Sequence, residues 1–458
     1  MDIEPSLTSA VDTLSRSFLG QLIPPGHPEY EHARRVHNGL VDRRPALVAR
    51  CHGTADVADA VRLARGLSLE IAVRGGGHNV AGRSTVDGGL LVDLSGMRGV
   101  HVDPAARRAT AQGGALWREM NRETQVHGLA TTGGVVGSTG VGGLTLGGGV
   151  GWLMARYGLA LDNLRTATLV LADGRVVRTS ADEEPDLFWA IRGGGGNFGV
   201  ATALEFELHP VGPVVVGGLA AFPFNEAKSV LRGWREVTAG AKDEEVLVAA
   251  LLTAPEGGHK VVAVGLCHSG PAPDGEMTAR RVKSLGTVVM DRMGPVPYST
   301  LNGMLDPTYP VGAFNYWKSH FLPSLSDDAI DTLVDAYGAC PSPAAHVVIE
   351  HFHGAATRVP VAATAFALRQ SGYNALLLGQ WLDPSLGERT MAWTRASYES
   401  LRPYLGERRY LNYLGDDDHG VADAVAAAYG PNVARLRELK QRYDPENVFH
   451  HNHNIDPG

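Results

Sequence analysis

The chain has few cysteines and no excess of basic charge. Its 458 residues include three cysteines, Cys51, Cys267 and Cys340, which lie far apart in the sequence. A scattered, odd-numbered set of this kind forms neither a disulfide framework nor a CxxC metal site. Lys and Arg total 41 against 49 Asp and Glu, for a net charge of −8. This balance argues against a nucleic-acid-binding protein, because such proteins present a basic face.

Long apolar runs are also missing. No run approaches the roughly 18 residues needed to cross a bilayer. The start, MDIEPSLTSAVDTL, has no basic segment followed by an apolar core, as a signal peptide would have. We therefore expect a cytoplasmic protein, in a reducing compartment, that does not associate with membranes.

The length exceeds the roughly 250–300 residues over which a single core grows, so we expect two domains. A first block ends near Pro210. Its predicted strands lie at 45–51, 69–73, 89–95, 98–103, 107–113 and 200–208, and its predicted helices at 54–65, 116–127 and 184–192. The pair Asp173-Gly174 predicts a hairpin between the runs TLVLA and RVVRTS.

Beyond Val214 glycine becomes scarcer, and strands are interleaved with helices. Helices are expected near 225–239, 275–285, 326–338 and 385–405, and strands near 245–252, 260–267, 345–351 and 374–381. This order predicts an α+β protein in which helices cover one face of an antiparallel sheet. A last segment begins near Tyr410 and contains a predicted helix near 432–442.

Glycine is the residue in excess. There are 57, about 12% of the chain against a usual share of about 7%, and they cluster at 75–77, 133–151 and 193–199. Glycine lets the main chain approach a ligand closely, and successive exposed amides form concavities that bind anions. Three such loops in one block predict a large, extended and phosphorylated ligand.

One cluster contains the pattern of a dinucleotide-binding fingerprint. The run GGGNFG at 194–199 matches G-x-G-x-x-G, which requires a strand before it, a helix after it and an acid about 20 residues later. Here a predicted helix precedes it, a predicted strand follows, and no acid stands near position 219. We therefore reject a Rossmann fold.

Five motifs follow one another in a fixed order: RGGGH (74–78), GVGGLTLGGGVG (140–151), YGLALDN (157–163), RGGGGNFG (192–199) and YDPENVFHHNHNI (443–455). Together they resemble the berberine-bridge-enzyme-like branch of the vanillyl-alcohol-oxidase, or PCMH-type, flavoproteins. The resemblance implies an FAD-binding domain of two α+β subdomains over 1–210, with its core at about 43–210. It further implies a substrate-binding cap domain over 211–408 and a C-terminal segment, 409–458, that returns to the FAD domain.

The resemblance also implies a covalent bond between His78 and the 8α-methyl carbon of FAD. Such a bond requires an unprotonated imidazole nitrogen held against the flavin. The alternative is that His78 is an ordinary loop residue that hydrogen-bonds its neighbours. Many relatives add a second bond through a cysteine, but VGSTGVGG (136–143) places Val136 at that position. We therefore expect one covalent bond, through His78.

The same resemblance implies the remaining FAD contacts and the oxidant. Val136, Thr139 and Leu144 match an apolar pocket where some relatives admit oxygen, so O2 is the expected electron acceptor. The full set of expected cofactor-binding residues is Arg74, Gly75, Gly76, Gly77, His78, Asn79, Gly82, Val136, Gly137, Ser138, Thr139, Gly142, Gly143, Leu144, Gly148, Gly149, Gly151, Asn163, Asn197, Gly199, Val200, Asn452 and Asn454.

Flavin oxidation of a C–H bond often needs a base for the accompanying proton. Glu350, in the apolar strand HVVIEHFHG, is the candidate, because a relative has a glutamate in the corresponding strand. A solvent-facing position for Glu350 is the alternative. In YLNYLGDDD, Tyr410 and Asn412 alternate with Leu411, and the family implies a place beside the flavin for this pair. Tyr413 is a candidate proton donor; ordinary core packing is the alternative for both tyrosines.

The C-terminal tail is rich in histidine but does not predict a metal site. His450, His451 and His453 lie close together in FHHNHNIDP without a cluster of carboxylates or cysteines. We expect no metal.

Two functions follow from these expectations. The first is an FAD-dependent oxidase that removes hydride from an alcohol, an amine or a phenolic secondary metabolite and passes electrons to O2. The alternative is an oxygenating enzyme of secondary metabolism that uses a flavin–oxygen adduct. For assembly we expect a homodimer.

Overall fold

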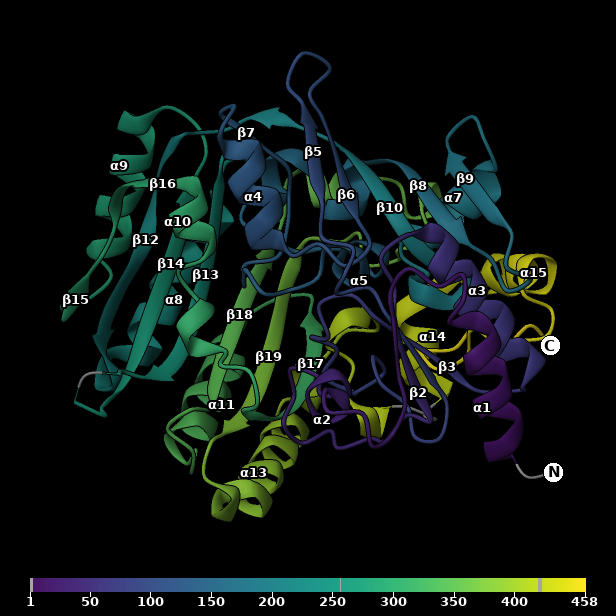
Figure 1. Ribbon diagram of the computed structural model, residues 1–458. Helices are drawn as coiled ribbons and strands as arrows, with labels where there is room; N and C mark the ends of the chain where they lie inside the picture. Colours follow the sequence, from purple (N-terminus) through teal and green to yellow (C-terminus); the bar gives the residue numbers. More distant parts are fainter. Residues whose placement is uncertain (1–2, 256, 419–421) are drawn as a thin grey trace.

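The computed structural model describes residues 3–255, 257–418 and 422–458. Among these residues the strands form sheets of four, five and eight strands and one short two-stranded pair (Figure 1). The four- and five-stranded sheets lie next to each other, and the eight-stranded sheet lies beside them. This arrangement confirms the predicted α+β class.

The four-stranded sheet has the order β1-β2-β4-β3. Its strands are β1 (Gln21–Ile23), β2 (Leu47–Arg50), β3 (Ile71–Arg74) and β4 (Leu90–Asp93). Helix α3 (Thr54–Gly66) connects β2 to β3, as predicted, but β4 lies between them and is parallel to both. All four residues of β4 are buried, as is typical of a central parallel strand covered on both faces.

The five-stranded sheet is antiparallel, with the order β5-β6-β10-β8-β9. Its strands are β5 (Val100–Asp103), β6 (Arg108–Gln112), β8 (Leu164–Val170), β9 (Val176–Ser180) and β10 (Val200–Glu207). The predicted hairpin joins β8 to β9, and Gly174 in its turn has a φ of 80°. Helix α7 (Pro185–Ile191) precedes the GGGNFG run and β10 follows it, so the connection is not that of a Rossmann fold.

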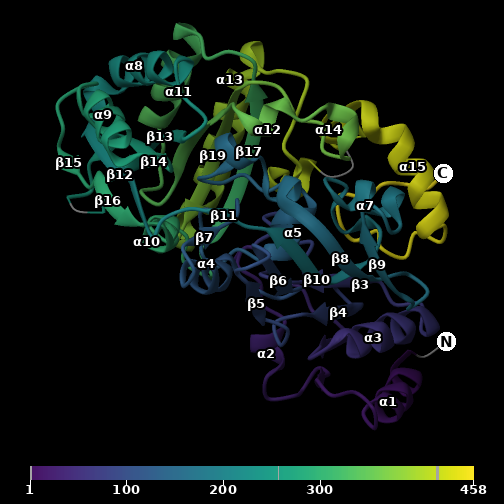
Figure 2. The same cartoon turned by 90° about the horizontal axis from the view of Figure 1, so that it is seen from above.

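The eight-stranded sheet is antiparallel, and helices cover one of its faces (Figure 2). Its strands are β12 (Val214–Pro223), β13 (Glu245–Thr253), β14 (Lys260–His268), β15 (Met290–Asp291), β16 (Gly294–Pro297), β17 (Phe314–Leu322), β18 (His346–Phe352) and β19 (Gly372–Trp381). The covering helices are α8 (Ala227–Ala239), α9 (Ala272–Lys283), α11 (Asp327–Gly338) and α13 (Gly387–Ser400). We call this sheet and its helices the cap.

The four predicted strands and four predicted helices of this region are confirmed, but the short strands β15 and β16 and the long strands β12 and β17 were not predicted. In β12 the pair Gly217-Gly218 interrupts an apolar run. In β17 the buried residues include Lys318 and Ser319, so apolar and polar residues do not alternate there. Tertiary contacts, rather than the local pattern, make these two segments strands.

Alternation along β18 gives the cap sheet two different faces. Val347 and Ile349 pack in the core beneath the covering helices. His346, Val348 and Glu350 point the other way and line a cavity that the cap shares with the two smaller sheets. The period of two along a strand thus places Glu350 at the cavity.

The remaining elements connect or flank these layers. They are α1 (Ile3–Leu14), α2 (Tyr30–Ala33), α4 (Trp117–Gln125), β7 (Leu129–Ala130), α5 (Val141–Leu146), α6 (Met154–Tyr157), β11 (His209–Pro210), α10 (Tyr298–Asn302), α12 (Ala355–Arg358), α14 (Ala422–Tyr429) and α15 (Val433–Tyr443). The last helix, predicted near 432–442, packs against α7, and Phe449 beyond it joins the core of the four-stranded sheet. In the described part of the chain, no helix is both long and apolar enough to span a bilayer.

Candidate active site

A cavity of about 420 Å³ lies where the cap meets the two smaller sheets. Residues from all three glycine clusters, from the cap sheet and from the C-terminal segment line it. One end is therefore built largely by loops of glycine, and the other by side chains of the cap. We call these the loop end and the cap end.

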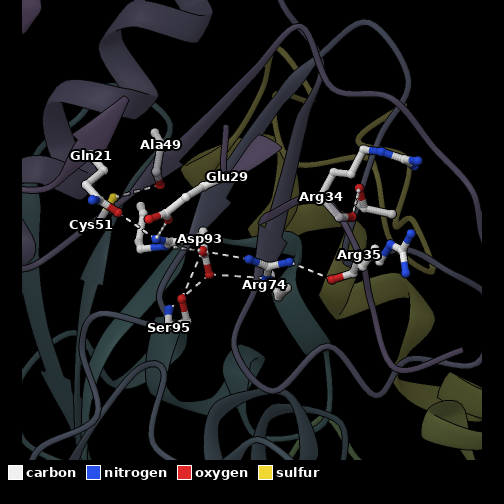
Figure 3. Close-up of polar contacts among 11 residues, drawn as sticks. Gln21, Glu29, Arg34, Arg35, Ala49, Cys51, Arg74, Asp93 and Ser95 are labelled. Carbon is white, nitrogen blue, oxygen red and sulfur yellow. Dashed lines mark hydrogen bonds and ion pairs between the residues drawn. The ribbon is translucent and has the colours of Figure 1, made fainter. Parts of the chain in front are cut away.

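An ion pair anchors the start of the RGGGH loop. The Arg74 guanidinium lies 2.6 Å from Asp93 of β4, and its Nη1 donates to the Arg35 carbonyl at 2.7 Å (Figure 3). Burial alone would raise the pKa of Asp93, but Arg74 and hydrogen bonds from Ser95 hold that pKa below its usual value. Arg74 itself lies outside the cavity lining, so it positions the loop from behind.

Two glycines of this loop are required by their surroundings. A Cβ on Gly76 would lie 2.2 Å from the backbone nitrogen of Gly140, so the RGGGH loop and the GVGG loop touch main chain to main chain. Gly77 has a φ of 71°, a conformation that side-chain-bearing residues rarely adopt. The glycines thus bring two loops together at the base of the cavity.

His78 follows these glycines and points to the junction of the two loops. Its Nε2 lies 2.8 Å from the Ser138 hydroxyl, and its ring stacks on that of His37 with centroids 3.8 Å apart. Burial, followed by the neighbouring His37 and Arg118, lowers the pKa of His78 to about 3. The imidazole is therefore neutral near neutral pH, as a nucleophile or ligand must be.

The loop end also contains buried polar atoms with no hydrogen-bond partner among the described residues. These are Arg83 Nε, Ser84 Oγ and Asn452 Oδ1, all on residues that line the cavity. Unpartnered buried polar atoms are rare and call for an absent ligand or water. Arg83, the sole Arg or Lys among the described lining residues, pairs with Asp416 at 2.9 Å and is the one cation that this end offers to an anionic group. A phosphorylated, polar cofactor such as FAD fits these residues.

Most of the predicted cofactor residues line this cavity. They are Gly75, Gly76, Gly77, His78, Asn79, Val136, Thr139, Gly142, Gly143, Leu144, Gly151, Asn197, Gly199, Val200 and Asn452. The others lie behind the lining: Arg74, Gly82, Gly137, Ser138, Gly148, Gly149, Asn163 and Asn454.

Several residues behind the lining have defined structural contacts. Asn163 donates to the carbonyls of Tyr157 and Leu159. The Gly137 amide donates to Asp306, which lies in the segment between α10 and β17. These residues stabilise the walls of the cavity from outside.

At the cap end Glu350 is the central polar group. Asn374, its cross-strand neighbour on β19, donates to Oε2 at 2.9 Å, and the Tyr413 hydroxyl donates to Oε1 at 3.0 Å. Burial raises the pKa of Glu350 to about 7, although both hydrogen bonds act to lower it. A carboxyl group that loses its proton near neutral pH is suited to act as a general base.

The YLNY segment joins the two ends of the cavity. It forms a 3₁₀ turn over Leu411–Tyr413 rather than the extended chain that its alternation indicated. The turn keeps Tyr410 and Asn412 together: Asn412 Nδ2 donates to the Tyr410 oxygen at 2.9 Å and to the Leu144 carbonyl at 3.0 Å. The Tyr410 oxygen also accepts from the Gly149 amide. Asn412 and Tyr413 line the cavity, whereas Tyr410 lies behind them.

The wall around Glu350 was not predicted from the sequence. Apolar side chains form most of it: Leu219, Val246, Val248, Ala250, Leu252, Ala263, Val348, Leu376 and Leu378. Tyr309, Trp317 and His346 add an aromatic side. No motif marks these residues, because they come together only through the register of six strands and one loop.

His346 and Tyr309 form a hydrogen-bonded pair within this wall. Burial lowers the pKa of His346 to about 4, so its ring is neutral. Its Nδ1 lies 3.1 Å from the Ala344 carbonyl and therefore carries the hydrogen; Nε2 then accepts from the Tyr309 hydroxyl at 2.8 Å. The Tyr309 oxygen is left as an acceptor for any further group.

All three cysteines are free and buried, and none is among the described lining residues; Val136 occupies the lining instead. His451 bonds to Glu70 and the Thr85 carbonyl, at 2.8 Å each. Among the described residues no group of three or more His, Cys, Asp or Glu is arranged to hold a metal.

Comparison with known proteins places this geometry in a family. Residues 45–180 match a model described as an FAD binding domain, and residues 409–456 match one described as berberine and berberine like. The (R)-6-hydroxynicotine oxidase of Paenarthrobacter nicotinovorans is 32% identical over 455 residues, which cover 96% of this chain and 97% of that protein. The chain belongs to the berberine-bridge-enzyme-like FAD-linked oxidoreductases.

Solved structures agree with this assignment. The crystal structure of 6-hydroxy-D-nicotine oxidase from Arthrobacter nicotinovorans has a TM-score of 0.87 and 31% identity, and covers 96% of this chain and 99% of that one. Glucooligosaccharide oxidase from Acremonium strictum, whose FAD is bonded through a cysteine and a histidine, has the same fold, with a TM-score of 0.87, 23% identity and 99% coverage of both chains. This oxidoreductase therefore has a PCMH-type fold and FAD as its cofactor.

Proposed function

We propose that this protein is an FAD-dependent oxidase with one covalent bond to FAD, through His78. When bound, FAD supplies the hydride acceptor. Arg83, Ser84, Asn452 and the glycine loops would hold it at the loop end. The neutral, buried imidazole of His78 supports the covalent bond, since only an unprotonated nitrogen can form it.

The observation that carries the proposed redox reaction is the buried carboxyl group of Glu350 at the cap end. It is the proposed base: it takes the proton of the substrate N–H or O–H while hydride leaves the adjacent carbon. Its pKa of about 7 leaves a substantial ionised fraction near neutral pH. The Tyr413 hydroxyl orients Oε1, and Asn374 orients Oε2. The apolar wall excludes water from the reacting atoms.

The cap end favours an apolar substrate with one amine or hydroxyl group. A wall of aliphatic and aromatic side chains offers few partners for the many hydroxyls of a sugar. Glu350 and the Tyr309 oxygen are acceptors, and no Arg or Lys of the described residues lines this end, so an anionic substrate has no counter-charge there. An amine such as the one that 6-hydroxynicotine oxidase is named for fits better than the oligosaccharide of xylooligosaccharide oxidase, a relative with 28% identity.

O2 is the proposed electron acceptor. Val136, Thr139 and Leu144 line the cavity beside His78, and their small apolar groups leave room for a nonpolar gas molecule near the flavin. The second candidate is an oxygenating enzyme, which the same apolar lining would serve. In that case oxygen would enter the organic product instead of leaving as peroxide.

Anaerobic mixing tests the oxidase proposal. The FAD-loaded protein is mixed with N-methyl-1-phenylethylamine, with the matched alcohol 1-phenylethanol, and with xylobiose, while the flavin absorbance is followed. Bleaching by the amine or the alcohol supports the proposal, and bleaching by xylobiose alone contradicts the proposed substrate. Reaction under isotopically labelled O2 then separates the candidates: label in peroxide indicates an oxidase, and label in the organic product an oxygenase.

A further inference from the structure

The chain segment that ends at His37 is fixed to the RGGGH loop and to the cap. Arg74 donates to the Arg35 carbonyl at 2.7 Å (Figure 3), and the His37 amide donates to the Gly77 carbonyl at 3.0 Å. From the other side, the Gly312 amide of the cap region donates to the His37 carbonyl at 2.9 Å. The main chain of His37 thus has a defined position relative to both the loop that carries His78 and the cap.

The ring of His37 lies flat against the ring of His78. The centroids are 3.8 Å apart and the planes are inclined by 21°. His37 is 8% exposed, and its Nδ1 has no hydrogen-bond partner among the described residues. Hydrogen bonding at Nδ1 therefore does not explain the orientation of this ring, whereas the stack on His78 does.

Two contacts together fix the plane and the rotation of the His78 imidazole. His37 covers one face, and the Ser138 hydroxyl engages Nε2 at 2.8 Å. With Nε2 engaged, Nδ1 is the nitrogen left to react. A stacked pair of this kind also favours two neutral rings, because two adjacent cations would repel each other.

We propose that His37 is a positioning residue for the covalent attachment of FAD: its ring holds the His78 imidazole in the plane from which Nδ1 reaches the 8α-methyl carbon. The inference rests on the proposed bond at His78 and goes beyond it, since it assigns a role to a residue outside every glycine motif. Holding two reacting atoms in the correct geometry accounts for large rate effects, and a misplacement of about 1 Å costs roughly a hundredfold.

Attachment of the imidazole reduces the flavin ring by two electrons. A bond forms between Nδ1 and the 8α carbon, and one C–H of the methyl group and the N–H of the imidazole lose their protons. The flavin gains two electrons and two protons, and O2 then removes them as peroxide. With Nδ1 as the reacting nitrogen, the imidazole hydrogen is on Nε2, and the Ser138 oxygen, 2.8 Å away, is the first acceptor for the departing proton.

Two variants of similar volume test the role of the flat ring. His37→Phe keeps an aromatic face, and His37→Leu removes it; His32→Ala, at an exposed histidine on α2, is the matched control. Each protein is produced without flavin and mixed with FAD, and the covalent fraction is followed by flavin fluorescence of the denatured protein. Thermal unfolding and the affinity for non-covalent FAD are measured in parallel.

We expect His37→Leu to attach FAD about ten- to a hundredfold more slowly than wild type, with unchanged non-covalent affinity, and His37→Phe to stay within about threefold of wild type. His32→Ala should behave as wild type. Equal rates for the Leu variant and wild type, or equal rates for the Leu and Phe variants, would overturn the inference. If wild type itself never forms the bond, the proposed function fails instead.

Discussion

The two ends of the cavity are built in different ways. At the loop end the protein brings bare main chain together, as where Gly76 meets Gly140, and few side chains contribute. At the cap end two strands of one sheet and the C-terminal segment bring together side chains that are far apart in sequence, as with Glu350, Asn374 and Tyr413. Because the two ends depend on separate residues, a substitution in the cap wall can leave the glycine loops intact.

The largest effect that separates the two ends is expected at Glu350. Glu350→Gln removes the proposed base but preserves size and hydrogen-bonding shape, so the rate of flavin reduction should fall by about 10²–10⁴-fold. Covalent attachment of FAD should be unchanged, because Glu350 lies at the other end. Stopped-flow absorbance with the amine or alcohol that reacts fastest measures the rate of flavin reduction. Flavin fluorescence of the denatured protein measures covalent attachment. A variant that reduces its flavin at the wild-type rate excludes Glu350 as the base.

The same variant should change how stability depends on pH. The pKa of Glu350 is raised from 4.5 to about 7, so folding favours its protonated form, and this contribution is lost as pH rises from 4.5 through 7. Relative to wild type, Glu350→Gln should therefore become more stable over that range, by up to about 3 kcal/mol above pH 7. Urea unfolding of both proteins across this pH range measures the difference. A difference that stays constant with pH means that the carboxyl group is not perturbed.

At the loop end, Gly76→Ala should act on the fold and on the cofactor together. The added Cβ would lie 2.2 Å from a backbone atom, so main chain must move, at a cost of about 2 kcal/mol or more. We expect lower stability to denaturant and a loss of FAD uptake. Gly66→Ala in α3, where nothing lies within 4 Å of the new Cβ, is the control and should unfold as wild type or slightly later. Normal FAD binding by Gly76→Ala would show that the two loops need not touch.

The smallest of these effects is expected at Tyr413. Tyr413→Phe removes one hydrogen bond to the Glu350 carboxylate, so the pKa of Glu350 should rise further and the rate at neutral pH should fall about tenfold. The acid limb of the pH–rate profile should shift to higher pH, while the rate at high pH recovers. An unshifted profile with a lower rate at every pH would assign Tyr413 a role other than tuning Glu350.

The sequence predicts the loop end of the site better than the cap end. The loops around His78 and Gly140 could be identified because closely approaching main chain requires glycine, and glycine is visible locally. Trp317 and Tyr309 could not be identified from the sequence. The segment that contains them, β17 and the loop before it, has no apolar alternation, and the pocket depends on strand register. His37 and Arg83 were missed for another reason: each is a single polar residue outside any motif, and only the fold brings Arg83 to the cavity and His37 against the ring of His78.

Covalent attachment at His78 is the claim on which the account depends, and peptide mapping of the FAD-loaded protein tests it most directly. The protein is denatured with acid, digested, and its flavin-containing peptides are identified by mass. We predict that wild type retains the flavin on the peptide that contains His78, and that His78→Ala releases its flavin into the supernatant. Flavin released from wild type, or retained by His78→Ala, would contradict the account.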